Sequence, residues 1–293
     1  MAWVYVQFGS LPQAVGILYG VKPVIIAIIL QALWSLGRTA VKTRFLAVVG
    51  LVGLVLSFLG VNPLIVIFAL GSITGLGQWI SMQKKQEKPT LRSLVLLLAT
   101  PLLAYVVQMA AATAYSTPSS SGLWPIFLLF LKIGSVVFGS GYVLLAFLRG
   151  DIVVHLHWLT DSQLIDAVAI GQVTPGPVFT TATFIGYLLA GPSGALVATV
   201  GIFIPAFILV AISGPLIPRI RQSHIAGAFL DGVIVASLAL IAFVTYELAR
   251  TALVDVATII LAIASSLLLI RFRINSAWLV LAGAVVGLLR FAL

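Results

Sequence analysis

Residues 161–190 read DSQLIDAVAIGQVTPGPVFTTATFIGYLLA, and they decide how the fold is built. Two short apolar pieces stand on either side of Pro175, Gly176 and Pro177. A helix needs about 20 apolar residues to cross a bilayer, so neither piece spans alone. Proline cannot continue a helix interior, and glycine allows a sharp bend. The stretch therefore predicts a discontinuous helix, two half-helices that together cross the membrane once.

The start of the second half-helix is a candidate site for a small anion. Pro177 suits the first turn of a helix. The amides that follow it, with the hydroxyls of Thr180 and Thr181, would offer donors to a tetrahedral oxyanion. Backbone groups freed at this depth are tolerated where they face protein or a water-filled cavity. A kink that serves packing alone is the alternative. The candidate substrate-binding residues of this stretch are Gln172, Thr174, Pro175, Gly176, Pro177, Thr180 and Thr181.

The composition is that of a membrane protein. Of the 293 residues, 61% are apolar and 8% are charged, and the mean hydropathy is +1.22, outside the range of soluble domains. We expect an all-α, polytopic transmembrane helical bundle in the cell membrane, with the lipid bilayer as its partner. The 16 Lys and Arg fall between apolar segments, so they indicate cytoplasmic loops and no nucleic-acid partner. The sequence has no cysteine, and we expect no metal and no cofactor.

Long apolar runs recur along the chain and predict the crossings. Besides 161–190, we expect spanning segments at 21–38, 45–60, 62–80, 93–113, 124–148, 194–213, 225–249, 251–270 and 275–292. The connector 82–92 is rich in lysine and indicates the cytoplasm, whereas 115–122 is uncharged, rich in serine and indicates the outside. With these loops fixed, a single crossing by 161–190 leaves more Lys and Arg on the cytoplasmic side than a segment that enters and returns.

An internal repeat appears when the sequence is compared with itself at an offset of 212 residues, which aligns Gly20 with Gly232. The run Arg38, Thr39, Ala40 then meets an identical run that starts at Arg250. Chance similarity between apolar helices is the alternative. With a single crossing by 161–190, the two copies have opposite orientations, and such inverted repeats recur in secondary transporters.

The repeat also divides the chain. We expect the remainder of an N-terminal transmembrane repeat at 1–92, a linker helix and external loop at 93–123, and a C-terminal transmembrane repeat at 124–293. Residues 124–212 have no counterpart in the first copy, so we expect that roughly 89 residues are missing in front of Met1. A misplaced start codon, a truncated protein and a separate chain that supplies the rest are the explanations. A second copy of this chain, in a homo-oligomer, is the alternative to a separate chain as the protein partner.

Two features of the segment 124–148 suggest that it lines the pathway. Gly139 and Gly141 interrupt the helix, at a cost of up to about 1 kcal/mol each against alanine; close helix packing is the alternative. Lys132 stands eight residues past Trp124, or about 12 Å into the helix. A charge at that depth costs about 2.5–3.5 kcal/mol, so Lys132 snorkels, has a partner, or is a countercharge for the substrate.

Polar residues near the start of the first half-helix have structural interpretations. Thr160 with Gln163 predicts a capping box. Asp161 and Asp166 complement the helix dipole, and a role of Asp166 in a proton or cation cycle is the alternative.

Other charged residues read as pairs at the membrane interface. We expect Arg149 to pair with Asp151, and Glu247 to pair with Arg250 on one helix face. The spans contain no His-Glu-x-x-His motif, no Gly-x-Ser-x-Gly motif and no close cluster of carboxylates. We therefore expect that the protein is not an enzyme and that it has no catalytic residues.

These residues together resemble the chromate ion transporter family. FGSGYVLLAFLRGD at 138–151, the stretch 158–191 and TVGIFIPAF at 199–207 look like its C-terminal half, and VKPVIIAIILQALWSLGRTA at 21–40 looks like the end of its N-terminal half. The resemblance implies secondary efflux of chromate, proton-driven or otherwise, with sulfate as a structural mimic. The family's N-terminal half normally opens with its own Phe-Gly-Gly and Pro-Gly-Pro elements, which this sequence lacks.

The sequence thus predicts a secondary membrane transporter that exports chromate, with Lys132, Gly139, Gly141 and the stretch from Gln172 to Thr181 at the substrate. Two alternatives stay open. In the first, the physiological substrate is sulfate or another oxyanion. In the second, the chain is a truncated, non-transporting membrane subunit.

Overall fold

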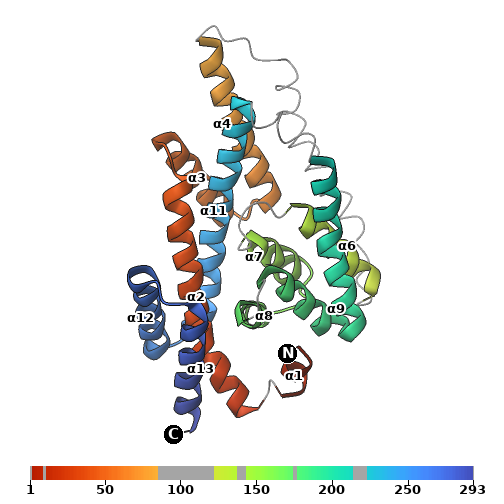
Figure 1. The fold of residues 1–293 in the computed structure, drawn as a ribbon, viewed down its shortest axis with the longest axis vertical. Helices are drawn as coiled ribbons and strands as arrows, with labels where there is room; N and C mark the ends of the chain where they lie inside the picture. The colour runs from red at the N-terminus through yellow and green to blue at the C-terminus, as the bar shows by residue number, and fades with distance from the viewer. Residues whose placement is uncertain are drawn as a thin grey trace.

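The structure is a computed structural model, and every regular element that it describes is a helix (Figure 1). The described residues are 2–8, 11–84, 122–136, 143–173, 177–213 and 223–292. Among these residues, four helices are long and apolar enough to cross a bilayer, within Gln13–Ala40, Pro63–Met82, Phe179–Ile208 and His224–Ala252. The prediction of an all-helical polytopic bundle is confirmed.

The described helices have the following bounds. In chain order they are α1 (Ala2–Phe8), α2 (Pro12–Ala40), α3 (Arg44–Phe58), α4 (Pro63–Lys84), α6 (Leu123–Val136), α7 (Val143–Leu148), the π-helix η1 (Arg149–His155), α8 (Asp161–Val173), α9 (Pro177–Ser213), α11 (His224–Ala252), α12 (Val256–Phe272) and α13 (Ser276–Ala292). The span expected at 21–38 begins earlier, at Pro12. The span expected at 93–113 lies outside the described residues.

The repeat seen in the sequence recurs in the helix boundaries. The helices α2 and α11 both have 29 residues and begin at Pro12 and His224, which are 212 positions apart. The helices α3 and α12 begin at Arg44 and Val256, again 212 positions apart. Each of these two starts is capped by the side chain before it, Thr43 in one copy and Asp255 in the other. Equivalent sequences therefore fold into equivalent elements.

The two copies run in opposite directions. Lys42, just past the end of α2, pairs with Asp231 near the start of α11. At the other end, Tyr19 near the start of α2 donates a hydrogen bond to Asp255, just past the end of α11. The positions of Tyr19 and Asp231 are themselves equivalent, 212 apart. Figure 1 shows α2 and α11 side by side with opposite directions, as an inverted repeat requires.

The copies also exchange partners. The helix α2 packs against α12 and α13, and α11 packs against α3 and α4. Gly20 on α2 permits the first crossing, because a Cβ there would lie 1.9 Å from the carbonyl oxygen of Gly283 on α13. The equivalent Gly232 on α11 faces Thr74 on α4 in the same way. Small residues at such crossings let helix backbones approach closely in a membrane.

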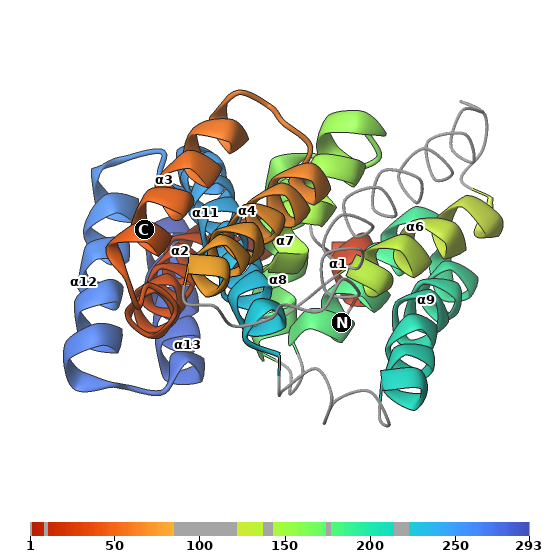
Figure 2. The same cartoon turned by 90° about the horizontal axis from the view of Figure 1, so that it is seen from above.

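The helices within residues 123–213 form a second group beside this frame. Figures 1 and 2 place α6 and α9 together, on the side of the molecule away from α12. The helix α9 bends at Ala190 and Gly191, where Gly191 has φ +64°, a conformation open to glycine. Its two arms fold against each other, so that a Cβ on Gly186 would lie 2.4 Å from the carbonyl oxygen of Gly194. The bend separates the half-helix predicted up to residue 190 from the span predicted at 194–213.

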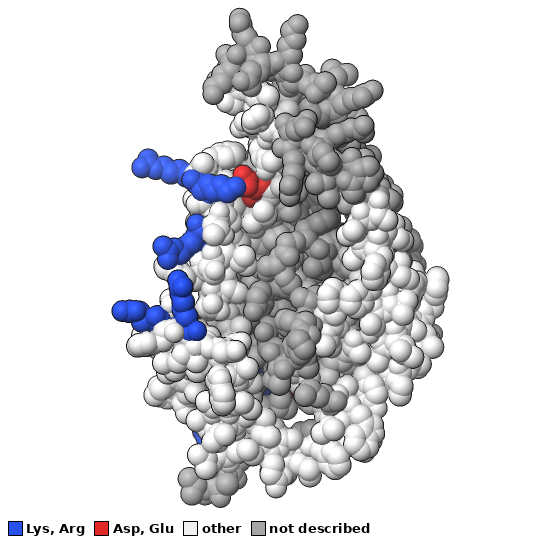
Figure 3. Space-filling model, viewed as in Figure 1, with Lys and Arg blue, Asp and Glu red and all other residues white. Residues whose placement is uncertain are grey.

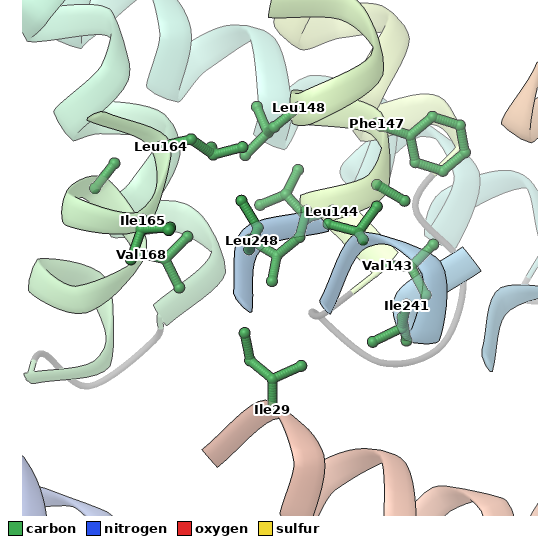
Figure 4. Packing of buried hydrophobic residues seen from close by; sticks show 14 of the residues in the cluster. Ile29, Val143, Leu144, Phe147, Leu148, Leu164, Ile165, Val168, Ile241 and Leu248 are labelled. Atoms are coloured by element: carbon green, nitrogen blue, oxygen red, sulfur yellow. The ribbon is translucent and has the colours of Figure 1, made fainter. Parts of the chain in front are cut away.

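The buried core joins the two groups. Ile29 of α2, Leu144 and Leu148 of α7, Leu164 of α8 and Ile241 of α11 belong to one cluster of buried side chains (Figure 4). The half-helix α8 is thus held against the centre of the inverted repeat, where α2 and α11 cross.

Candidate functional site

The candidate site begins with the half-helix α8, whose first turn is fixed by the predicted capping box. The amide of Gln163 donates to Oγ1 of Thr160 at 3.2 Å, and the amide of Thr160 donates to Oε1 of Gln163 at 2.9 Å. Two backbone donors at the helix start are thereby satisfied. The capping box is confirmed, and it sets the residue at which α8 begins.

The break in the segment 161–190 stands where the sequence placed it, since α8 ends at Val173 and α9 begins at Pro177. Thr180 and Thr181 lie in the first turn of α9, with Thr180 partly exposed and Thr181 buried. Of the other predicted site residues, the following lie outside the described residues: Gly139, Gly141, Thr174, Pro175 and Gly176. The side chains of Gln172 and Pro177 lie outside them too.

Tyr5 shows that α8 and the first arm of α9 lie side by side. Its hydroxyl donates to Oδ2 of Asp166 on α8 at 2.8 Å, and its ring centroid lies 5.3 Å from that of Phe184 on α9. Asp166 and Phe184 are 18 residues apart, which would separate them by about 27 Å along a straight helix. One tyrosine cannot contact both across that length. The two half-helices therefore lie side by side and the segment folds back on itself, an arrangement that the sequence did not predict.

Lys22 is a site residue that the sequence reasoning missed. Its Nζ lies 3.1 Å from Oδ1 of Asp166 and donates to the hydroxyl of Ser162 at 2.7 Å. The side chains of Lys22 and Asp166 are 18% and 4% exposed. An isolated charge in such surroundings is costly, so each compensates the other. The sequence signal for this residue was a lysine within a long apolar run, directly before Pro23. Because the expected span starts at residue 21, Lys22 stood at the end of that span, where a polar residue is ordinary.

Arg149 joins three elements. Its Nε donates to Asp161 on α8 at 2.8 Å, and its Nη2 donates to Glu247 on α11 at 2.8 Å. The predicted pairs of Arg149 with Asp151 and of Glu247 with Arg250 are therefore wrong, because neighbours in sequence were preferred to partners across helices. The guanidinium of Arg250 instead lies 6.0 Å from the ring centroid of Tyr246.

Lys132 has a carboxylate partner. Its Nζ donates to both carboxylate oxygens of Asp151 on η1, each at 2.9 Å. The two side chains are 11% and 15% exposed, which places the pair mostly inside the protein. Of the three possibilities for this lysine, the structure therefore shows the second, a partner. The helix α6, which carries Lys132, packs against α9.

Three cations of this part of the molecule are each held by a carboxylate: Lys22 by Asp166, Arg149 by Asp161 and Glu247, and Lys132 by Asp151. Such an arrangement keeps positive charge inside an apolar bundle. It can release that charge to an anion only when the carboxylate partner moves or is neutralised. Among the described residues, no group of three or more His, Asp or Glu could hold a metal ion.

Comparison with known proteins identifies the family. The profile of the family described as Chromate transporter matches residues 1–76 and 124–288. The chromate transport protein of Cupriavidus metallidurans is 32% identical over 295 residues, which cover 100% of this chain and 71% of that protein. The probable chromate transport protein of Synechococcus elongatus is 33% identical, over 89% of this chain and 64% of that protein. The chromate transport protein of Pseudomonas aeruginosa is 32% identical, over 85% and 59%.

The chain spans 71%, 64% and 59% of these relatives. No solved structure matches it. Because the profile covers most of the sequence, including both half-helices and the two repeat helices α2 and α11, the chain belongs to the chromate transporter family.

Proposed function

We propose that the chain is a secondary transporter that exports chromate across the cell membrane, with sulfate-like oxyanions as mimics. Membership of the chromate transporter family supports chromate transport, and the apolar helices support a multi-pass membrane protein. Export and competition by sulfate are the finer parts of the proposal. No covalent chemistry is required.

One observation carries the proposal. The first arm of α9 begins at Pro177 and is folded against α8. Thr180 and Thr181 lie near the start of this arm. The amides of a helix start and nearby hydroxyls are suited to a small anion. A half-helix that ends inside the bundle brings these donors to a depth at which an oxyanion must otherwise lose its water. The substrate therefore sits between the half-helices, with the stretch from Gln172 to Thr181 around it.

Lys132 and Lys22 are the candidate sources of positive charge for the substrate. Both lysines are held by carboxylates. A dianion that arrives between the half-helices competes with Asp151 and Asp166 for them. Binding of the substrate is then coupled to rearrangement of these ion pairs, which is the kind of two-state element that alternating access requires.

Transport in inverted membrane vesicles tests the proposal. Vesicles that contain the chain should accumulate chromate, and sulfate in excess should reduce the initial rate. Thr181→Val, which removes a buried hydroxyl of the first turn, should lower that rate. Thr183→Val, the same change half a turn along α9, should lower it less, because Thr183 lies further from the start of the half-helix and its hydroxyl bonds to Thr199 on the second arm.

The outcomes separate the alternatives. Sulfate accumulation that exceeds chromate accumulation at equal concentration indicates another physiological oxyanion. An absence of accumulation for every oxyanion, in a chain that is folded and inserted, indicates a non-transporting subunit and refutes the proposal for the chain alone. A chain supplemented with a homologous N-terminal segment then shows whether a separate part completes it.

A further inference from the structure

A cavity lies away from the half-helices, between the C-terminal end of α2 and the N-terminal half of α11. Its volume is about 620 Å³, within the range of about 300–1,000 Å³ that small-molecule sites occupy. Most of its wall is apolar, from Leu36 on α2, Val143 on α7, and Val233 and Ile241 on α11. An apolar wall does not suit a dianion, so this cavity is no part of the proposed chromate site. It suits the hydrocarbon part of an amphiphile.

Ser237 places an unused polar group on the wall of this cavity. The residue is 4% exposed, and its hydroxyl has no hydrogen-bond partner in the described part of the chain. Other buried hydroxyls behave differently, since Ser57 and Thr245 each donate to the carbonyl four residues earlier in their helices. A buried hydroxyl without a partner is costly. A ligand with an acceptor oxygen at this depth would satisfy it.

The mouth of the cavity is positively charged and lies at a membrane surface. Lys42 pairs with Asp231 at 2.7 Å on its rim, and exposed Arg38 and Arg44 flank Lys42 in sequence. Residues 38–44 therefore carry three cations, and one carboxylate, Asp231, stands on the rim. Trp34 on α2 is 56% exposed, and exposed tryptophan favours the headgroup level. Figure 3 shows basic side chains along the edge of the molecule where α2 and α3 lie.

We propose that this cavity binds an anionic phospholipid from the surrounding bilayer. The phosphate of the lipid lies at Lys42, and an ester carbonyl accepts a hydrogen bond from the hydroxyl of Ser237. One acyl chain lies along the apolar wall toward Ile241. Asp231 and Ser237 are six residues apart on α11, or about 9 Å along its axis, a depth that the glycerol linkage and the lysine side chain cover between them. The bond to Asp231 leaves Lys42 further donors for a phosphate.

The cavity is open on the side from which a lipid would arrive. Leu230 and Ile234 line it and are 47% and 42% exposed. Both are on the outer face of α11, where acyl chains surround a membrane protein. Because the site joins α2 to α11, an occupied site stabilises the contact between the two repeats by mass action.

Native mass spectrometry and thermal unfolding of the purified chain in detergent test the proposal. Phosphatidylglycerol should bind one molecule per chain and raise the melting temperature. Phosphatidylcholine, whose choline cation is repelled by Arg38, Lys42 and Arg44, should bind about tenfold more weakly. Inorganic phosphate alone should do neither. Ser237→Phe, which fills the cavity, should abolish tight binding of phosphatidylglycerol, whereas Ile263→Phe on the exposed face of α12 should leave it unchanged.

Two further variants keep the test decisive. Ile234→Trp blocks the opening from an exposed position, and should abolish binding even where Ser237→Phe fails to fold. The triple variant Arg38→Gln, Lys42→Gln, Arg44→Gln should bind both lipids equally. The proposal is overturned by equal binding of both lipids to the unaltered chain, by a shift with phosphate alone, or by a folded Ile234→Trp variant that binds phosphatidylglycerol as the unaltered chain does.

Discussion

Nζ of Lys22 lies 3.1 Å from Oδ1 of Asp166, and this contact ties the repeat helix α2 to the half-helix α8. The same carboxylate accepts a hydrogen bond from Tyr5, whose ring packs on Phe184 of α9. One acidic side chain therefore links the frame of the protein to both half-helices. Any movement of the half-helices that opens the candidate site must first change its contacts.

Removal of one member of this pair should be far more damaging than removal of both charges. Lys22→Met leaves Asp166 buried without its cation, which should destabilise the chain by about 3–5 kcal/mol. Lys22→Met with Asp166→Leu should recover much of that loss. Unfolding in mixed micelles measures the difference, and Lys42→Met, which breaks an exposed pair, should cost at most about 1 kcal/mol. Equal effects of Lys22→Met and Lys42→Met would contradict the buried pair.

The crossing of α2 and α13 should depend on Gly20. Gly20→Ala places a Cβ 1.9 Å from a backbone carbonyl oxygen of Gly283, so the two helices must separate and the melting temperature should fall. Gly37→Ala on the same helix meets no atom within 4 Å. It should be neutral or stabilising by up to about 1 kcal/mol, because alanine favours the helix. A melting temperature that is the same in both variants would exclude the close crossing.

Arg149 should not be replaceable by lysine. Its guanidinium donates in two directions, to Asp161 and to Glu247, and one ammonium group cannot reproduce that fork. Arg149→Lys and Arg149→Gln should both reduce stability, by about 3 kcal/mol for the neutral variant, which leaves two carboxylates without their cation. Arg250→Gln is the matched control and should cost less. Retention of full stability in Arg149→Gln would show that the bridge contributes nothing.

Lys132 and Asp151 should have opposite effects on substrate affinity. If Lys132 is a countercharge, Lys132→Gln raises the KM for chromate, whereas Asp151→Asn frees the lysine and lowers it. A pair that serves structure alone predicts a loss of stability in both variants and no opposite change in KM. Initial rates of chromate uptake over a range of concentrations, with protein levels measured in parallel, distinguish the two.

Local features of the fold could be predicted from the sequence. Apolar runs located the helices, the capping box at Thr160 set the start of α8, and the two prolines marked the break before α9. The offset of 212 residues anticipated the boundaries of α2 and α11. Each of these depends on residues close together in sequence or on a regular pattern, which is why one sequence sufficed.

Contacts between distant segments could not be predicted in the same way. Arg149 has Asp151 two residues away, yet it pairs with Asp161 and Glu247, because helix packing decides which carboxylate lies within reach. The fold-back of α8 on α9 had no local signal, since loop charges differ little between one crossing and a return. Lys22 and Asp166 are 144 positions apart, and only the assembled helices bring them together.

Accessibility of a cysteine introduced at Thr180 tests the central claim most directly. The chain has no cysteine of its own, so a membrane-impermeant thiol reagent reports this position without background. The account predicts that Thr180→Cys is labelled and that chromate slows the labelling, while a cysteine at Ile263, on the exposed face of α12, is insensitive to chromate. A cysteine at position 180 that no reagent reaches in any condition, or that reacts equally fast with and without chromate, would contradict an oxyanion site at the start of α9.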